Sequence, residues 1–472
     1  MNELGAADFI SGFGHSLIQF EGIFLFALVA YWVAAQWRPL LRNFSTPIGE
    51  ISFALSLLFG LGFAIVCGRE LGPEFLLLTT AIGFSIALAF QNGTIAVCFL
   101  CAMLFFRPWE LVENNDYLLL LPKFSFVICF AHAILALAFR RKSLPTWNRA
   151  ATLVVLFSIW AYLTTFKADD PADARFYYFE TFFKSAILFL VTLNSIWSRR
   201  DLEVLVVSLL ITFFGIGVIS LSQTIGYAHA SHDPAVRLMG LGAYSNPNDI
   251  AALMVFVFPL ALGRLLRAGV PWGLRAFSAL LLVVSSVSIY WSQSRGAMLG
   301  LATAIGVLLV VRIRRRALNV AFICLLLIGM TGYLHYSSRD SEDLEESSAS
   351  RWTFVKAGIM MGVKNPVFGV GFNSYARNFE RYADELVEYG HRTAHNSWVL
   401  VLSETGVPGF LLYIATFFVS LKFAWRVFPV FPEFLLTMAG YGVAISFLSH
   451  SYLLYPFLLY GLIGAAHRVS VV

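Results

Sequence analysis

Three arginines and one histidine, far apart along the chain, are the residues best suited to chemistry. Arg237, Arg295 and Arg351 stand beside apolar runs, and His395 directly precedes another such run. A guanidinium keeps its charge and binds phosphate oxygens through paired hydrogen bonds. An imidazole with a near-neutral pKa takes a proton from a hydroxyl. Brought together, these side chains would hold a diphosphate leaving group and activate an acceptor hydroxyl.

Two of the arginines also have a purely structural explanation. Arg295, in SQSRGAMLGL, is explained equally well as a side chain that extends from a helix end to the membrane surface. Arg351, beside Trp352, is explained equally well as a loop residue at the level of the lipid headgroups. Both interpretations stay open at this point.

Three asparagines are predicted to support the site. Asn246 and Asn248 lie in the stretch NPND, which is a strong helix start, and Asn396 follows His395 as a candidate N-cap of the next helix. Helix capping alone explains all three.

Other charged residues inside predicted spans are weaker candidates. Lys184 is predicted to contact the diphosphate, because it lies about two turns from the outer end of its span, where a lysine usually faces a polar cavity. An ion pair with Glu180, one turn earlier, explains it equally well. Glu404, which is predicted to support the site, and Lys123 also lie inside predicted spans, and they are weaker candidates for facing a polar cavity. His391 and Arg392 rank below His395.

Composition determines which elements position these residues. The 472-residue chain is 58% hydrophobic and only 13% charged, and apolar runs recur along its whole length. Runs of about 18 or more residues without strand-like alternation predict membrane-spanning helices. The fold class is therefore all-α, a polytopic transmembrane bundle of about 12–15 spans. The predicted spans are 20–36, 51–67, 74–90, 93–106, 117–139, 151–166, 178–198, 203–222, 249–266, 272–292, 296–311, 317–334, 397–421, 433–449 and 451–466.

Charge in the loops predicts the orientation of these spans. Basic loops, which mark the cytoplasmic side, alternate with acidic or mixed loops along the chain. The amino terminus is then outside and the carboxyl terminus inside, and the loops 223–248 and 335–396 are extracytoplasmic. A loop as long as 335–396 is usually functional, and RWTFVKAGIMMG within it is predicted to be an amphipathic helix.

We predict three regions along the chain. Residues 1–222 are amino-terminal transmembrane helices, 223–421 are the core with the long outer loop, and 422–472 are carboxyl-terminal transmembrane helices.

Several functional classes are disfavoured. The five cysteines all lie in apolar segments, so we expect neither disulfides nor a zinc site. GVGFNSY follows no strand, so it predicts a turn and not a dinucleotide site. No nucleotide-binding or metal motif is present, and we expect no metal and no cofactor. Lysines and arginines cluster in short loops between spans, so the net positive charge does not imply a nucleic-acid partner.

Four stretches, RLMGLGAYSNPNDIAALM, SQSRGAMLGL, SRWTFVKAGIMMGVKNPVFGVGFNSY and HNSWVLVLSETGVPGFLLY, occur in this order. Together they resemble the signature segments of the O-antigen ligase and polymerase superfamily of bacterial membrane glycosyltransferases, over roughly residues 235–415. The resemblance implies a GT-C-like helical fold whose site opens to the periplasm. It also implies an undecaprenyl-diphosphate-linked glycan donor, no metal, arginines on the diphosphate (Arg237 and Arg295) and His395 as base. Whether Arg295 or Arg351 is the second phosphate clamp stays open.

The expected function is therefore glycosyl transfer in O-antigen or exopolysaccharide assembly, at the periplasmic face of the bacterial inner membrane. We favour a polymerase, because many spans and a long outer loop suit two lipid-linked substrates. The alternative is a ligase that transfers the glycan to lipid A-core or to protein hydroxyls. A polysaccharide transporter or flippase is disfavoured, since the charged residues gather at one face and not at the midplane. The expected partners are the lipid-linked donor, a glycan or lipid acceptor and the bilayer.

Overall fold

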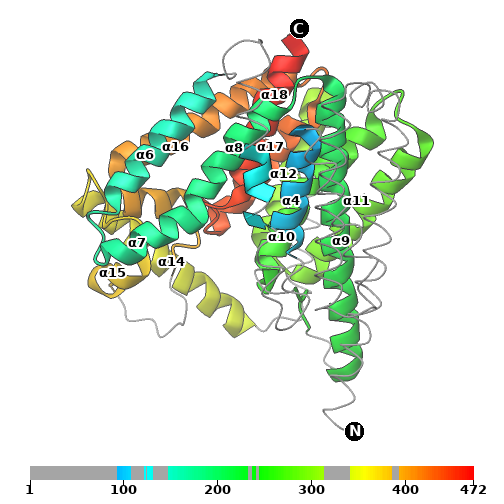
Figure 1. Ribbon diagram of the computed structural model, residues 1–472. Coiled ribbons are helices and arrows are strands. Elements are labelled where there is room, and N and C mark those ends of the chain that lie inside the picture. The colour runs from blue at the N-terminus through cyan, green and yellow to red at the C-terminus, as the bar shows by residue number, and fades with distance from the viewer. Residues whose placement is uncertain are drawn as a thin grey trace, which may run out of the picture. The chain divides into compact units, whose positions relative to one another are not determined.

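The computed structural model describes residues 93–107, 122–123, 125–130, 147–231, 236–240, 244–312, 341–384 and 393–471. Every regular element in these ranges is helical, which confirms the all-α fold class (Figure 1). The predicted spans 20–36, 51–67, 74–90 and 317–334, and most of 117–139, lie outside the described residues.

Six of the described helical runs are long and apolar enough to cross a membrane. They are Pro171–Ser195, Arg199–Ser231, Pro247–Leu266, Trp272–Ser292, Arg295–Arg312 and Ser397–Val427. The predicted span 272–292 has these same bounds, and the predicted spans 249–266 and 296–311 differ from the helices by one or two residues at an end. The other three differ by six to nine residues at one end. The polytopic transmembrane character predicted from composition is confirmed.

One predicted boundary is wrong. Helix α9 (Arg199–Ser231) continues beyond the predicted end at residue 222, so the first part of the predicted loop 223–248 is helix. The stretch QTIGYAHAS contains no proline, and Pro234 is the first residue that cannot continue the hydrogen-bond pattern. Polar composition alone did not end the helix.

The described helices fall into two compact units. The first unit contains α4 (Gly93–Phe106) and α9, where the rings of Phe105 and Phe213 lie 5.3 Å apart. Cys98, Cys101 and Cys129 are buried and free, as expected for small apolar residues, while Cys67 and Cys324 lie outside the described residues. The three-region division of the chain stays a prediction.

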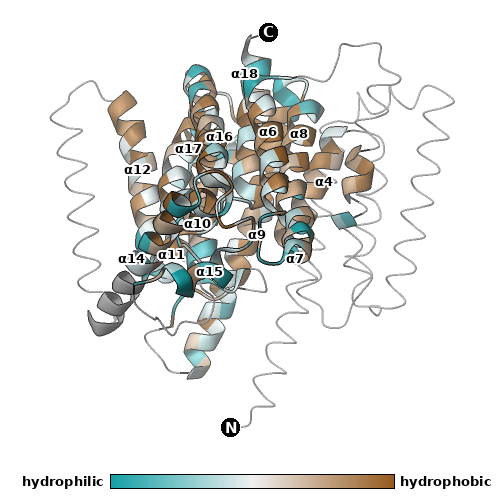
Figure 2. Ribbon diagram, turned by 90° about the vertical axis from the view of Figure 1, so that its left-hand side faces the viewer, coloured by the Kyte–Doolittle hydropathy of each residue, from teal (hydrophilic) through white to brown (hydrophobic). Residues whose placement is uncertain are grey.

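The second unit holds every predicted site residue that the structure describes, apart from Lys123. Its elements are α6 (Arg149–Thr164), α7 (Pro171–Tyr177), the π-helical turn η3 (Tyr178–Phe183), α8 (Lys184–Ser195), α10 (Pro247–Leu266), α11 (Trp272–Ser292), α12 (Arg295–Arg312), α14 (Ser341–Lys364), α15 (Tyr375–Tyr382), α16 (Ser397–Val427), α17 (Pro432–Ala444), the 3-10 turn η5 (Ile445–Phe447) and α18 (Leu454–Val471). Helix α10 packs against α11, α12 and α17, and α16 packs against α6, α14 and α18. Figure 2 shows hydrophilic residues gathered on α7 and α15, towards one end of this unit.

Basic residues and tryptophans mark one end of the second unit. The Arg468 guanidinium donates to the Ile196 carbonyl and stacks on Trp197, which joins the end of α18 to the end of α8. Arg267, after α10, pairs with Glu433 at the start of α17. The exposed tryptophans here are Trp147, Trp197, Trp272 and Trp425. Tryptophans are enriched at both membrane interfaces, and an excess of basic residues in short loops is typical of the cytoplasmic one. We call this end of the unit the basic end.

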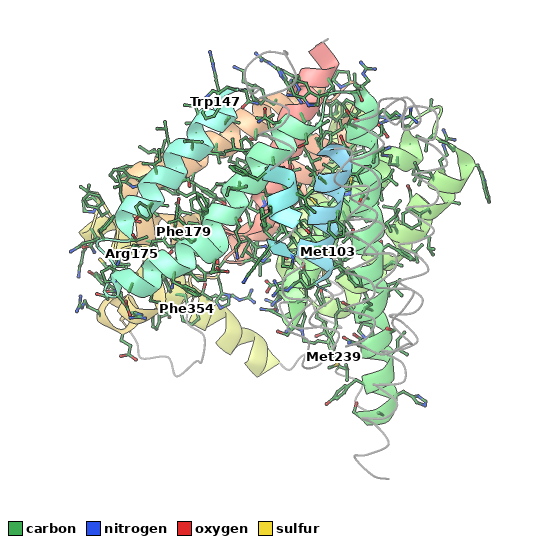
Figure 3. All side chains as sticks on the ribbon, viewed as in Figure 1. Met103, Trp147, Arg175, Phe179, Met239 and Phe354 are labelled. Atoms are coloured by element: carbon green, nitrogen blue, oxygen red, sulfur yellow. The ribbon has the colours of Figure 1, made fainter. Side chains whose placement is uncertain are left out.

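The opposite end, which we call the site end, is where α10, α12 and α16 begin and where α11 and α17 finish. Helices α14 and α15, from the predicted loop 335–396, contact the α16 side of this end and confirm the predicted helix there. Figure 3 shows Trp147 at the basic end, and Arg175 and Phe354 towards the site end.

Helices α12 and α17 make a close backbone approach in the middle of the unit. A Cβ added to Gly300 would lie 2.6 Å from the Gly440 carbonyl oxygen, and one added to Gly440 would lie 2.8 Å from the Gly300 carbonyl oxygen. Small residues permit such contact between membrane helices.

We predict that Gly300→Ala lowers the thermal stability of the detergent-solubilised protein, because the new methyl group must push α12 from α17. Overpacking of this kind costs about 1–3 kcal/mol. Gly273→Ala is the matched control, since nothing lies within 4 Å of its added Cβ. A melting temperature for Gly300→Ala equal to that of Gly273→Ala would contradict the packing described here.

Candidate functional site

Arg237 lies where the start of α10 meets the turn between α11 and α12. Its Nε and Nη2 atoms donate to the Ser292 carbonyl oxygen at 3.1 and 2.7 Å, and Nη2 also donates to Asn248 Oδ1 at 3.4 Å. The backbone N–H of Leu238 donates to the Trp291 carbonyl at 3.0 Å, which fixes the segment beside α11. Asn248 is therefore a direct partner of the arginine.

Asn246 begins α10 as the sequence predicted. Its side chain accepts from the Asn248 backbone N–H, and Pro247 takes the first helical position. A proline there loses no hydrogen bond, and its φ suits the helix. Asn246 thus holds the backbone that presents Asn248 to Arg237.

Arg295 is the first residue of α12 and its side chain is exposed. Gln293 adopts a left-handed φ of 53° and ends α11, and the Ser294 backbone N–H donates to Ser292 Oγ at 3.1 Å. This tight turn brings Arg295 to the same end of the bundle as Arg237, which bonds the Ser292 carbonyl.

His395 directly precedes α16 and has a left-handed φ of 44°. Asn396 is the N-cap of α16, accepting from the backbone N–H groups of Trp398 and Val399, as predicted. The His395 ring packs against Phe354 of α14, with centroids 5.6 Å apart.

Burial lowers the pKa of His395 below its ordinary value, and the positive charge of Arg351 lowers it further, whereas the Asp249 carboxylate opposes both effects. Arg351 therefore lies within electrostatic range of the imidazole. A lowered pKa leaves His395 neutral at pH 7, which is the form that accepts a proton.

A second histidine, which sequence reasoning missed, joins Asp249 to Tyr441. His450 Nε2 lies 3.0 Å from Asp249 Oδ1, and His450 Nδ1 lies 3.0 Å from the Tyr441 hydroxyl. The only local signal was the polar stretch SHS between the predicted spans 433–449 and 451–466. From the sequence, Asp249 is explained by the helix start at NPND alone.

The segment that carries His450 is bonded to the start of α16. The His450 backbone N–H donates to Ser397 Oγ at 2.9 Å, and Ser397 Oγ donates to the Leu448 carbonyl at 2.7 Å. Ser451 Oγ donates to the Ser397 carbonyl at 2.7 Å. These bonds set the position of the residues just before Ser397, and His395 is two residues away.

Residues 280–414 match the family model described as O-Antigen ligase. Over these residues the chain is similar to that family. The match supports the resemblance to the O-antigen ligase and polymerase superfamily, and with it a membrane glycosyltransferase. A search of curated proteins finds no match to the chain.

The segment that matches the family model includes only part of the candidate site. Arg295, Arg351, His395, Asn396 and Glu404 lie within the matched segment, whereas Arg237, Asn246, Asn248, Asp249 and His450 lie outside it. The geometry brings both sets to the site end.

Glu404, within the matched segment, makes structural contacts. Its carboxylate is buried and accepts from the Tyr375 backbone N–H at 3.2 Å. Residues 369–375 form a turn, as predicted, with left-handed φ values at Gly369 and Gly371. Glu404 therefore holds this turn against α16, which is a supporting role.

Lys184 is paired. Its Nζ lies 2.5 Å from Glu180 Oε2, and both side chains are partly exposed. This favours the ion-pair interpretation, while a contact with substrate stays an untested prediction. Lys123 is exposed and belongs to the other unit, and His391 and Arg392 lie outside the described residues.

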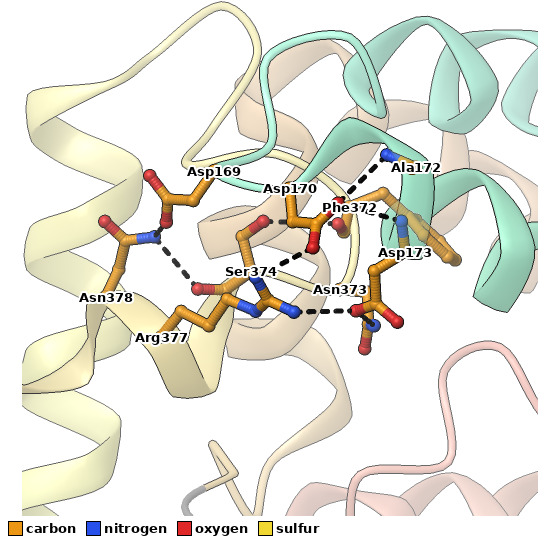
Figure 4. Close-up of polar contacts among 9 residues, drawn as sticks. All are labelled: Asp169, Asp170, Ala172, Asp173, Phe372, Asn373, Ser374, Arg377 and Asn378. Atoms are coloured by element: carbon orange, nitrogen blue, oxygen red, sulfur yellow. Dashed lines mark hydrogen bonds and ion pairs between the residues drawn. The ribbon is translucent and has the colours of Figure 1, made fainter.

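An ionic clamp attaches α15 of the outer loop to the start of α7. Arg377 donates to Asp170 at 3.3 Å and to Asp173 at 3.1 Å, Asn373 donates to Asp173 at 3.2 Å, and Asn378 donates to Asp169 (Figure 4). The Asp173 backbone N–H and then Arg377 lower the pKa of Asp170 below its ordinary value. The contact between Arg377 and Asp170 is therefore intact at neutral pH and weakens as the pH falls through that lowered pKa.

The clamp also supports the packing around His395. Tyr375 donates its hydroxyl to the Phe354 carbonyl at 2.6 Å, and the Phe354 and Phe379 rings lie 5.0 Å apart. Helix α15 thus holds Phe354, which packs against the His395 ring.

Among the described residues, no three His, Cys, Asp or Glu side chains gather as a metal site would require. The absence of a metal or other cofactor from the reaction stays a prediction. The described side chains of the candidate site offer a ligand the positive charges of the arginines and the imidazole of His395.

We predict that Arg377→Gln speeds amide hydrogen exchange in α15 by roughly two- to fivefold, because exposed ion pairs contribute modestly and are screened by salt. Arg381→Gln, an exposed arginine on the same helix, is the control and should leave exchange unchanged. Raising the salt concentration should reproduce the effect in the parent protein. Unchanged exchange in Arg377→Gln would show that other contacts hold α15.

Proposed function

We propose that the protein transfers an undecaprenyl-diphosphate-linked glycan to an acceptor hydroxyl in O-antigen or exopolysaccharide assembly. The observation that carries this proposal is the convergence of Arg237, Arg295 and Arg351 with His395 at one end of the second unit. The O-antigen ligase match over 280–414 supports the reaction class.

In the proposed reaction, neutral His395 takes the proton from the acceptor hydroxyl as its oxygen attacks the anomeric carbon of the donor. The bond between that carbon and the diphosphate oxygen breaks, and its electron pair leaves with the lipid diphosphate. Guanidinium groups stabilise the developing charge, which is where fixed charges contribute most to catalysis. Direct displacement of this kind inverts the anomeric configuration.

Arg237 and Arg295 form the primary diphosphate set in this proposal, with Arg351 as a further contact. Asn246, Asn248, Asn396 and Glu404 act through the backbone and side chains they hold. Lys184 is a further candidate contact with the diphosphate, although its charge is balanced by Glu180 in this structure.

The acceptor in our proposal is a second lipid-linked glycan, which makes the enzyme a polymerase. Support comes from α14 and α15, which extend the site end beyond the membrane helices and suit a second bulky substrate. A ligase that uses lipid A-core or a protein hydroxyl has the same chemistry and is the alternative outcome.

We place the site on the periplasmic face of the inner membrane. Support comes from the arginines and tryptophans of the basic end, since basic residues are retained on the cytoplasmic side. The Asp169–Asp173 segment at the other end carries acidic residues instead.

This orientation predicts opposite labelling of two exposed residues by a membrane-impermeant maleimide in intact spheroplasts. Ser245→Cys, at the site end, should react from outside, whereas Ala268→Cys, at the basic end, should react only after permeabilisation. The parent protein sets the background from its native cysteines. Reaction of Ala268→Cys from outside, with Ser245→Cys protected, would reverse the proposed face.

Glycosyl transfer by the purified protein tests the site. With a lipid-linked glycan donor and acceptor, His395→Ala should lower the turnover rate by about 10²–10⁴-fold, the usual contribution of a general base. Arg237→Ala and Arg295→Ala should lower it too, because each removes charge from the diphosphate. Arg426→Ala changes an exposed arginine at the basic end. It is the matched control and should leave the turnover rate unchanged.

Full activity in His395→Ala and Arg295→Ala would contradict the assigned roles, and transport without glycosidic bond formation would favour a flippase. A deletion strain separates the two enzymes. Loss of long glycan chains indicates a polymerase, and long glycan retained on its lipid carrier indicates a ligase.

A further inference from the structure

Asp249 stands between two histidines. Its Oδ1 atom lies 3.0 Å from His450 Nε2, while its negative charge also acts on His395. The Asp249 side chain is 29% exposed, and that of His450 is 4% exposed. The carboxylate is therefore partly accessible, whereas the second imidazole is buried.

The hydrogen bonds among Asp249, His450 and Tyr441 determine which group donates and which accepts. A carboxylate only accepts, so His450 Nε2 carries the proton and donates to Asp249. His450 Nδ1 then accepts from the Tyr441 hydroxyl, 3.0 Å away. Both ring nitrogens of His450 are occupied, so His450 holds Asp249 and does not act on substrate.

The backbone brings the same groups to His395. His450 donates its N–H to Ser397 Oγ, and Ser397 begins α16 two residues after His395. Asp249 begins α10 beside Asn248, which bonds Arg237. These bonds thus link Asp249 to the segments that carry the proposed base and the proposed diphosphate clamp.

We propose that Asp249, held by His450 and Tyr441, is the positioning carboxylate of His395 and stabilises the imidazolium that forms when His395 takes the acceptor's proton. The proposal rests on the proposed function. The acceptor O–H bond breaks, the N–H bond of the imidazolium forms, and the new positive charge faces Asp249. The proton passes to water once the lipid diphosphate has left.

Other groups near His395 and His450 also affect the pKa that the pH profile of the reaction reports. Arg351 on α14 faces His395 and acts against its protonation, opposite in sign to Asp249. Tyr441 on α17 and Tyr455 on α18 face the His450 ring, with centroids 6.2 and 5.6 Å away. Among these groups, Asp249 supplies the negative charge.

The test is the pH dependence of kcat/KM for glycosyl transfer in Asp249→Asn. Asparagine keeps the size of the side chain and still accepts from His450, but it lacks the charge. We expect kcat to fall at least about tenfold, a part of the effect of a general base. We also expect the acidic limb to move to lower pH, because His395 without its carboxylate protonates less readily. The KM for donor should stay within about twofold of the parent value.

His450 provides a matched pair of variants. In His450→Gln the amide can donate to Asp249 and accept from Tyr441, so activity should stay close to the parent value. In His450→Leu both bonds are lost, and kcat should fall as in Asp249→Asn. Thermal stability measured in parallel separates a folding defect from a loss of positioning.

The outcomes separate this proposal from the function on which it rests. Full activity of His395→Ala would overturn the proposed function. An inactive His395→Ala beside an Asp249→Asn with the parent pH profile would overturn the pairing alone. A fall in kcat without any shift of the acidic limb would also overturn it, because loss of a merely structural residue would have that effect.

Discussion

The hydrogen bond between Asp249 and His450 is the contact on which the site end depends. It joins residues 201 positions apart, from the first turn of α10 and the segment before α18. The same segment bonds Ser397, so the starts of α10 and α16 are held against a common element. A buried imidazole without these partners would be costly, which makes the arrangement of the three segments mutually dependent.

This constraint has an electrostatic consequence. Helices α10, α12 and α16 all begin at the site end, and a helix start carries a partial positive charge and unpaired N–H groups. Asn246 and Asn396 satisfy some of these groups, and Arg237 and Arg295 add full charges. The helix starts and the arginine charges each favour an anionic ligand at the site end. The negative charge of Asp249 offsets part of this positive charge near His395.

Local sequence signals predicted the helices and their caps well, but not the contacts that assemble the site. Asn246 and Asn396 were recognisable because a cap depends on a few neighbouring residues. The Asp249–His450 pair was not, because no short-range pattern links residues so distant along the chain. The extension of α9 was missed for a related reason, since polar residues resemble a loop but do not end a helix. Arg237 and Arg295 were identified by type, while the shared Ser292 turn that brings them together required coordinates.

The two attachments around His395 differ in how they respond to their surroundings. The Arg377 clamp is exposed, so salt screens it, whereas the His450–Asp249 bond is largely buried and keeps its strength. Both converge on His395, one through Phe354 and the other through Ser397. Loosening α15 would therefore alter the packing on one face of the imidazole while leaving the carboxylate in place. Helix α15 can move in this arrangement without disturbing the bond between Asp249 and His450.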